Sequence, residues 1–143
     1  MSQNYIYTAQ SVQTRYWITS TEGDVAGQIV ATANGTSGPN LISLTFNKVL
    51  DPSGITTDVT IKGASGLYIA LPENATSGSK LVWSNDATNW QVDNTSGVYE
   101  IFPADGQDLY WMTDEATGPT VEVRKGSEVI EKENEWILTR ASA

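Results

Sequence analysis

Acid–base chemistry in this sequence would rest mainly on carboxylates, because the chain has 17 Asp and Glu but no histidine and no cysteine. Histidine is the usual general base near neutral pH and the commonest metal ligand. The acidic residues gather in turn-rich segments: Glu22 with Asp24, Asp105 with Asp108, Asp114 with Glu115, and Glu128, Glu131, Glu133 and Glu135. Paired carboxylates about 5–10 Å apart can hydrolyse glycosides, but acidic turns are also common on solvated surfaces. We therefore expect no enzyme activity, no cofactor and no bound metal.

The charge balance restricts the partners. Eight Lys and Arg stand against 17 Asp and Glu, which gives a formal net charge of −9. Such a charge repels phosphate backbones and anionic membranes. No apolar run approaches the ~20 residues of a membrane helix, and the start of the chain, MSQNYIYTAQ, lacks the regions of a signal peptide. We expect no nucleic-acid partner, no membrane insertion, and a monomer or weak homodimer that is cytoplasmic or has lost its signal.

Short β-strands must position any functional residue, because no window keeps an apolar stripe at helical spacing. Twelve short runs rich in Val, Ile, Thr, Tyr and Trp are separated by Gly, Asn, Asp, Ser and Pro clusters. Strands are therefore expected near residues 4–10, 15–21, 27–33, 41–46, 58–63, 67–73, 80–85, 89–94, 98–103, 109–115, 120–125 and 135–140.

The strands repeat in threes. The segments 15–23, 67–75 and 109–117 align on Tyr16, Tyr68 and Tyr110. A strand precedes each tyrosine, and we align these strands on Tyr7, Ile61 and Ile101. The strand that closes a unit opens with tryptophan in two units, at Trp90 and Trp136, and the segment LISLTF takes that place in the first.

Three units of four strands predict an all-β chain with the β-trefoil fold, in which six strands close a barrel and three hairpins cap it. The expected single domain spans residues 1–143, with repeats of approximately 1–50, 51–96 and 97–143. The tyrosines and tryptophans of the repeat would pack the core. The alternative is a β-sandwich, since the segment LTFNKVL resembles a stretch of the fungal immunomodulatory proteins.

The chain resembles the fungal β-trefoil protease inhibitors, the mycocypins and the cospin group. The shared traits are length, an MS-type N-terminus, the absence of cysteine and the terminal strand WILTR at 136–140. The resemblance implies that a loop enters a protease cleft in substrate-like form while the barrel holds it rigid, which lowers the ordering cost of binding. The segment 20–27 lacks the Lys or Arg that trypsin inhibition needs, and 62–66 lacks the asparagine used against legumain, so papain-like proteases fit better. The candidate loop residues are Gln13, Thr14, Arg15, Glu22, Asp24, Asn34, Gly35, Thr36, Ser37, Gly38 and Asn74.

The chain is also similar in strand order to the ricin-B-type β-trefoil lectins. That family places a glutamine two residues before the tryptophan of the last strand and an acidic residue just after the aromatic and aliphatic pair of the second strand. Here the glutamine positions hold Thr88 and Asn134, and the acidic positions hold Ile18, Ala70 and Met112. A lectin would therefore need a different site, for which the candidates are Trp83, Asn85, Asp86, Trp111 and Asp114. Protease inhibition is the leading prediction and glycan binding the alternative; a fungal defence or storage protein is a third class.

Overall fold

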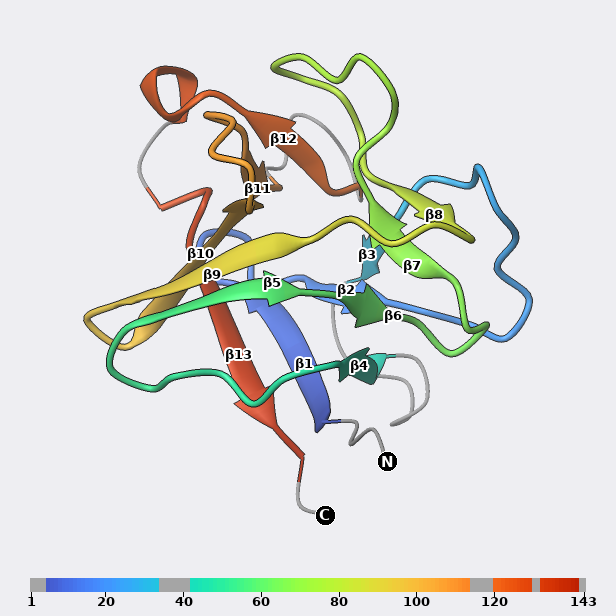
Figure 1. Cartoon of the computed structure of the whole chain (residues 1–143), viewed down its shortest axis with the longest axis horizontal. Helices are drawn as coiled ribbons and strands as arrows, with labels where there is room; N and C mark the ends of the chain where they lie inside the picture. The colour runs from blue at the N-terminus through green and yellow to red at the C-terminus, as the bar shows by residue number, and fades with distance from the viewer. Residues whose placement is uncertain (1–4, 34–41, 114–119, 130–131, 142–143) are drawn as a thin grey trace.

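The structure is a computed structural model that describes residues 5–33, 42–113, 120–129 and 132–141 (Figure 1). Each expected strand has a counterpart, and the strand expected at 58–63 appears as two, β5 and β6. The elements are β1 (Tyr5–Ser11), β2 (Trp17–Thr19), β3 (Ala31–Ala33), β4 (Leu44–Phe46), β5 (Ile55–Val59), β6 (Ile61–Lys62), β7 (Tyr68–Ala70), β8 (Val82–Ser84), β9 (Trp90–Thr95), β10 (Val98–Pro103), β11 (Tyr110–Met112), β12 (Glu122–Arg124), the 3₁₀ helix η2 (Gly126–Glu128) and β13 (Trp136–Arg140).

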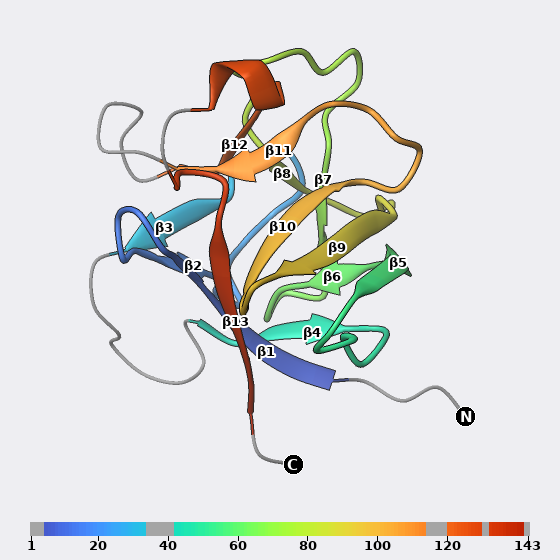
Figure 2. The same ribbon diagram turned by 90° about the vertical axis from the view of Figure 1, so that its left-hand side faces the viewer.

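The barrel strands form a closed ring. Their order is β5-β9-β10-β13-β1-β4-β6, and only Thr60 separates β5 from β6, so the sheet returns to its starting strand. Figure 2 shows β13 between β1 and β10, as the pairing requires. Closure removes sheet edges, so no helix is needed to cover them. A single closed ring excludes the alternative of two facing sheets.

Three hairpins join the barrel strands into equivalent units. The hairpins are β2–β3, β7–β8 and β11–β12. Their inner ends meet in a cycle of backbone hydrogen bonds: Val30 N–H donates to Leu81 at 2.9 Å, Leu81 to Val121 at 2.9 Å, and Val121 to Val30 at 3.0 Å. All three side chains are fully buried. This cycle lies on the pseudo-threefold axis that the repeat predicts.

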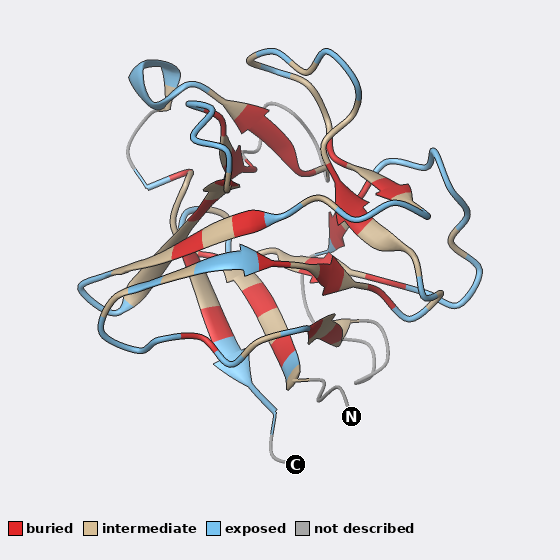
Figure 3. Ribbon diagram, in the orientation of Figure 1, coloured by how far each residue is buried: buried red, intermediate tan, exposed pale blue. Residues whose placement is uncertain are grey.

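The tryptophans of the repeat pack in the core, as expected, beside Val, Ile and Leu side chains, while the connecting loops are mostly exposed (Figure 3). Trp90 and Trp136 are fully buried, and their indole N–H groups donate to the carbonyls of Ile69 and Trp111 at 3.1 and 3.0 Å. Ile69 and Trp111 each follow the repeat tyrosine, so the same bond recurs in two units. Strand register places Leu44 at the tryptophan position of the first unit, since Leu44 pairs with Tyr7 as Trp136 pairs with Tyr99. The prediction that the repeat tyrosines pack the core is wrong: Tyr16, Tyr68 and Tyr110 are half-buried and lie outside the cluster of core side chains.

The alignment of Tyr7 with Ile61 and Ile101 is wrong by two residues. Register places Ala9 at that position, because Ala9 pairs with Leu138 as Ile101 pairs with Val92. Tyr7 instead packs on Phe46, with ring centroids 4.6 Å apart, and its hydroxyl accepts a 3.0 Å hydrogen bond from the amide of Leu50. The connection from Ala9 to the repeat tyrosine of the first unit is shorter than the connection from Ile101 to the repeat tyrosine of the third. Counting back from the tyrosines by a constant number of residues therefore selects the wrong residue in the first unit.

Strand β5 contains a β-bulge just before Thr60, which separates it from β6. The register with β9 shifts between Thr56 and Val59, and Asp58 adopts a left-handed φ of 56°. Asn47 fixes the bulge: its Oδ1 accepts from Thr60 N–H at 2.9 Å, and its Nδ2 donates to the Asp58 carbonyl at 3.3 Å. The bulge therefore holds Asp58 at a defined place on the surface.

In the part of the chain that the structure describes, no helix is long and apolar enough to cross a bilayer.

Candidate functional site

The candidate protease-binding loop that contains Gln13, Thr14 and Arg15 is a compact turn. The Ser11 amide donates to the Tyr16 carbonyl at 2.9 Å, and the Arg15 amide donates to the Ser11 carbonyl at 3.0 Å. Arg15 has a φ of 66°, and Gln13 and Arg15 are exposed. Thr14 is half-buried, and its hydroxyl accepts from the Tyr16 amide at 3.2 Å. The turn thus folds back on itself, whereas the inhibitor resemblance implies an extended loop.

The acidic loop after β2 is also internally bonded. The carboxylate of Asp24 accepts from the Thr21 amide at 2.8 Å and from the Thr21 hydroxyl at 3.1 Å. Glu22 is exposed and lines a small hollow of about 180 Å³ with Ser43 and Gly63. The carboxylate of Asp24 therefore stabilises the turn that contains it, and of these two acidic residues only Glu22 lines the hollow.

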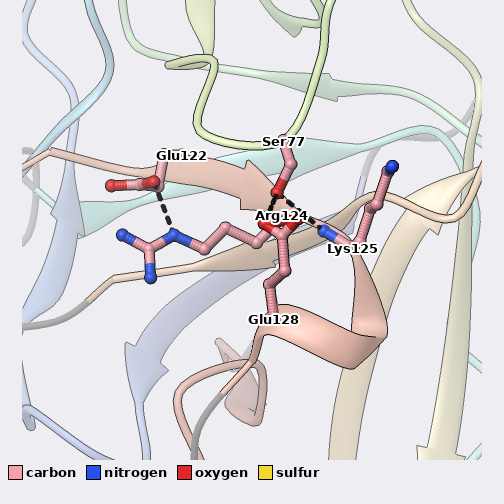
Figure 4. Close-up of polar contacts among 5 residues, drawn as sticks. All are labelled: Ser77, Glu122, Arg124, Lys125 and Glu128. Carbon is pink, nitrogen blue, oxygen red and sulfur yellow. Dashed lines mark hydrogen bonds and ion pairs between the residues drawn. The ribbon is translucent and has the colours of Figure 1, made fainter.

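The β7–β8 connection, which contains Asn74, is anchored to the third unit. Asn74 is exposed with a φ of 57°. Figure 4 shows Ser77 between two partners: its hydroxyl donates to Glu128 at 2.7 Å and accepts from the Lys125 amide at 3.2 Å. Gly78 N–H donates to the Val123 carbonyl at 2.7 Å. These bonds hold the loop rigidly against β12 and η2.

Asn34, Gly35, Thr36, Ser37 and Gly38, the remaining inhibitor candidates, lie outside the described residues, and so does Asp114.

Trp83 and Trp111 are not sugar platforms. They are 1% and 0% exposed, so neither ring offers a face to a ligand. The ring of Trp111 contacts Trp90 and Trp136 edge to face, with centroids 5.0 and 6.3 Å apart. The prediction that these rings stack on a sugar is wrong, because both side chains point into the core formed by the hairpins and the barrel.

A groove lies where the end of β7 meets the loop after β8. It has a volume of about 420 Å³, and we call it the Asp86 groove. Its polar lining comes from Glu73, Ser84, Asp86 and Thr88. Glu73 and Asp86 are exposed, and no hydrogen bond in the described part of the chain occupies either carboxylate. Asn85 is exposed beside the groove but does not line it.

The apolar part of the Asp86 groove is aliphatic. Leu71, Pro72, Val82 and Ala87 contribute to it, whereas the Trp83 side chain is buried beneath. Carboxylates and hydroxyls can exchange hydrogen bonds with the hydroxyls of a sugar, and the aliphatic groups can cover its C–H faces. Of the predicted lectin residues, the structure brings only Asp86 to this groove with an exposed side chain. Glu73 and Ser84 were missed, although Glu73 follows β7 and Ser84 is the last residue of β8.

The two residues at the positions where the ricin-B-type lectins have glutamine, Thr88 and Asn134, form hydrogen bonds within the protein. The Thr88 hydroxyl accepts from the Leu71 amide at 3.1 Å, and the Asn134 amide donates to the Glu100 carboxylate at 2.6 Å. Burial raises the pKa of Glu100, the Asn134 bond lowers it, and the charges of Glu135 and Asp93 raise it, with a net increase. Glu100 is thus held in a site that disfavours its ionised form.

Glu100→Gln is expected to stabilise the protein at pH 7. Because the folded-state pKa of Glu100 is raised, stability is full below the unfolded pKa of about 4.3 and falls as pH rises through the folded value. The neutral amide of glutamine does not ionise, so this loss of stability does not occur, and its oxygen can still accept the hydrogen bond from Asn134. Denaturant unfolding should show a variant more stable than the parent at pH 7 and equal to it near pH 3.5.

Asn134→Ala provides the matched comparison for Glu100→Gln. It removes the contact that lowers the Glu100 pKa, so NMR titration should find a higher pKa for Glu100 than in the parent. Equal pH dependence in the parent and in Glu100→Gln would contradict the assignment.

Within residues 5–33, 42–113, 120–129 and 132–141, no group of three acidic side chains is placed to hold a metal ion.

No family model matches the sequence, and no curated protein matches it significantly. Solved structures do resemble it. Rhizoctonia solani agglutinin has a TM-score of 0.75 at 16% identity, with 99% of this chain and 96% of that chain covered. SeviL, solved bound to asialo-GM1 saccharide, has a TM-score of 0.68 at 14% identity, with 98% and 100% covered.

A third similar structure is a GlcNAcα1-4Gal-releasing endo-β-galactosidase from Clostridium perfringens. Its TM-score is 0.73 at 11% identity, with 96% of this chain covered. The present chain spans only 33% of that enzyme's length. At these identities the likeness establishes the fold. Together with the closed barrel and the cycle of hydrogen bonds at its axis, it identifies the chain as a β-trefoil.

Proposed function

We propose that this protein binds carbohydrate through the Asp86 groove. The observation on which the proposal rests is a solvent-accessible groove whose two carboxylates have no internal partner among the described residues. An exposed carboxylate pays little desolvation penalty before binding and forms strong, charge-assisted hydrogen bonds with hydroxyl donors. The β-trefoils that resemble this chain include an agglutinin and a protein bound to a saccharide, which supports the same class of ligand.

Rigid walls favour binding at this groove. The Leu71 amide bonds to the Thr88 hydroxyl at 3.1 Å, and the Asp86 amide bonds to the Ser84 hydroxyl at 3.0 Å. Both bonds fix loops that form the groove before any ligand arrives, which lowers the entropy cost of binding. The aliphatic floor lacks an exposed aromatic ring, so we expect hydrogen bonds to supply most of the affinity.

Asp86→Ala is expected to weaken binding of the best ligand on a glycan array by about tenfold to 100-fold, since a hydrogen bond to a charged group contributes about 1.5–3 kcal/mol. Glu73→Ala should act in the same direction. Isothermal titration calorimetry measures both. Because both side chains are exposed, thermal unfolding should show that the variants remain as stable as the parent.

Glu22→Ala is the matched control for Glu73→Ala, because Glu22 is an exposed carboxylate on the loop after β2, which corresponds to the loop after β7, and it does not line the groove. Its affinity should equal that of the parent. A protein that binds no glycan on the array, or an Asp86→Ala variant with unchanged affinity, would refute the proposal.

Protease inhibition is the competing prediction, and it is tested in parallel. Papain, legumain, trypsin and subtilisin are assayed with the parent protein, and we expect no inhibition because the described candidate loops are closed turns or are anchored to β12 and η2. We also expect binding without turnover, so glycans incubated with the protein should be recovered intact. Submicromolar inhibition of any of the four proteases would favour the competing function.

A further inference from the structure

A second groove adjoins the Asp86 groove. It has a volume of about 470 Å³, and we call it the Asn89 groove. Asn89 and Asp105 contribute polar side chains to it, as do Asp58 on the β5–β6 bulge and Gln107 on the turn after β10. It therefore lies between the second unit and the first strand of the third, outside the hairpin that forms the Asp86 groove.

The two grooves are neighbours, and we call them together the cleft. Leu71 and Thr88 line both of them. The hydrogen bond from the Leu71 amide to the Thr88 hydroxyl, at 3.1 Å, lies within this shared wall. A ligand long enough to pass over these two residues would reach both grooves.

The walls of the Asn89 groove are held in place. Ala104 N–H donates to the Asn89 carbonyl at 2.9 Å, and the backbone and side-chain amides of Gln107 donate to Asp105 at 3.1 and 2.8 Å. Asp58 is fixed by the bulge and by Asn47. In the described part of the chain no hydrogen bond occupies the side chains of Asn89 and Asp58. Fixed walls with unoccupied amide and carboxylate groups are suited to a second sugar residue.

The charge of the cleft indicates which ligands it accepts. Glu73 and Asp86 line one half, Asp58 and Asp105 line the other, and neither lining contains Lys or Arg. The whole chain has a net charge of −9. Carboxylates repel a sialic acid or sulfate group and accept hydrogen bonds from neutral sugar hydroxyls.

We infer that the two grooves together bind an uncharged oligosaccharide of two or more residues. The inference rests on the proposed carbohydrate binding: the Asp86 groove holds one residue, and the chain of sugars continues past Leu71 and Thr88 into the Asn89 groove. It adds a second subsite and a charge preference that the first groove alone does not require.

Affinity against ligand length tests the second subsite. The probes are three neutral series of one to four residues: N-acetylglucosamine to chitotetraose, galactose to lacto-N-tetraose, and mannose to mannotetraose. Calorimetry should show that a tetrasaccharide of the series that binds has at least about tenfold higher affinity than its monosaccharide. Asn89→Ala and Gln107→Ala should reduce this ratio by about threefold to tenfold.

Asn85→Ala is the matched control for the length test. It is the same substitution on the same loop, at an exposed residue that lines neither groove, so the ratio should remain that of the parent. A monosaccharide that binds as tightly as its tetrasaccharide, or an Asn89→Ala variant with an unchanged ratio, would overturn the inference while leaving the Asp86 groove as a site. Failure of all three series to bind would overturn both proposals.

The charge preference has its own measurement. Lactose should bind more tightly than 3′-sialyllactose, or neutral chitotetraose more tightly than its partly sulfated form if that series is the one that binds. Asp58→Asn and Asp105→Asn should each narrow the difference by about threefold, because each removes one repulsive charge beside the cleft. Equal affinity for charged and neutral ligands would contradict the charge preference.

Discussion

Trp111→Ala is expected to lower the free energy of unfolding by about 3–5 kcal/mol, the range for removing a large aromatic side chain from a core. Trp111 is 0% exposed and lies between two other tryptophans. Its ring meets those of Trp90 and Trp136 at 87° and 89°, the edge-to-face geometry that aromatic pairs prefer. The substitution would remove both ring contacts and leave a cavity. Urea unfolding followed by far-UV circular dichroism measures the decrease in the free energy of unfolding.

Trp17→Ala is the control for Trp111→Ala. Trp17 follows the repeat tyrosine of the first unit as Trp111 follows that of the third, but it is only half-buried. The loss there should be about 1–2 kcal/mol, in proportion to the smaller apolar area that is covered. Equal losses at the two positions would contradict the assignment of the larger effect to burial. Reduced glycan binding by Trp111→Ala at temperatures where it is folded would contradict a purely structural role for Trp111.

The fold was predictable because several residues that recur in the repeat are residues that pack the core. Tryptophan at 90 and 136 recurs for a physical reason, since each indole N–H bonds the carbonyl after a repeat tyrosine. Short runs rich in Val, Ile and Thr indicated the strands of the barrel. The bulge at Asp58 was not predictable, because a left-handed aspartate and its Asn47 clamp involve residues on different strands.

The exposure of the tryptophans could not be read from the sequence. Trp83 lies on a strand whose pattern also suits a sugar platform, yet its ring is 1% exposed and packs closely against Gly63. Trp17 and Trp111 share a repeat position, yet their burial differs. The residue type alone did not distinguish a core tryptophan from a ligand platform.

The candidate grooves were only partly predictable. Asp86 was selected from its loop, but Glu73 meets it only because the two sides of the β7–β8 hairpin lie together. The Asn89 groove combines Asp58 with Asp105, which are far apart in sequence. A site at the junction of two units becomes visible only when the barrel has closed.

Gly63→Ala is expected to destabilise the protein by about 3 kcal/mol, the upper part of the range for overpacking a core. A Cβ at Gly63 would lie 2.7 Å from two ring carbons of Trp83. The ring is 1% exposed and belongs to the packed core. The hydroxyl of Ser20, which accepts a hydrogen bond from the Ala64 amide, closes the other side. The added methyl group therefore has to displace either the ring or the chain that crosses from β6 to β7.

Two other glycines separate this steric cost from backbone strain. Gly66 has a φ of 86° with open space around it, so Gly66→Ala should cost about 1–2 kcal/mol through conformation alone. Gly23 has neither a positive φ nor a close neighbour, so Gly23→Ala should change stability by less than about 0.5 kcal/mol. Chemical denaturation of the three variants should rank them in that order. Gly63→Ala as stable as Gly23→Ala would show that the Trp83 ring is free to move, in which case Trp83 could reach the Asp86 groove and its exclusion as a sugar platform would fail.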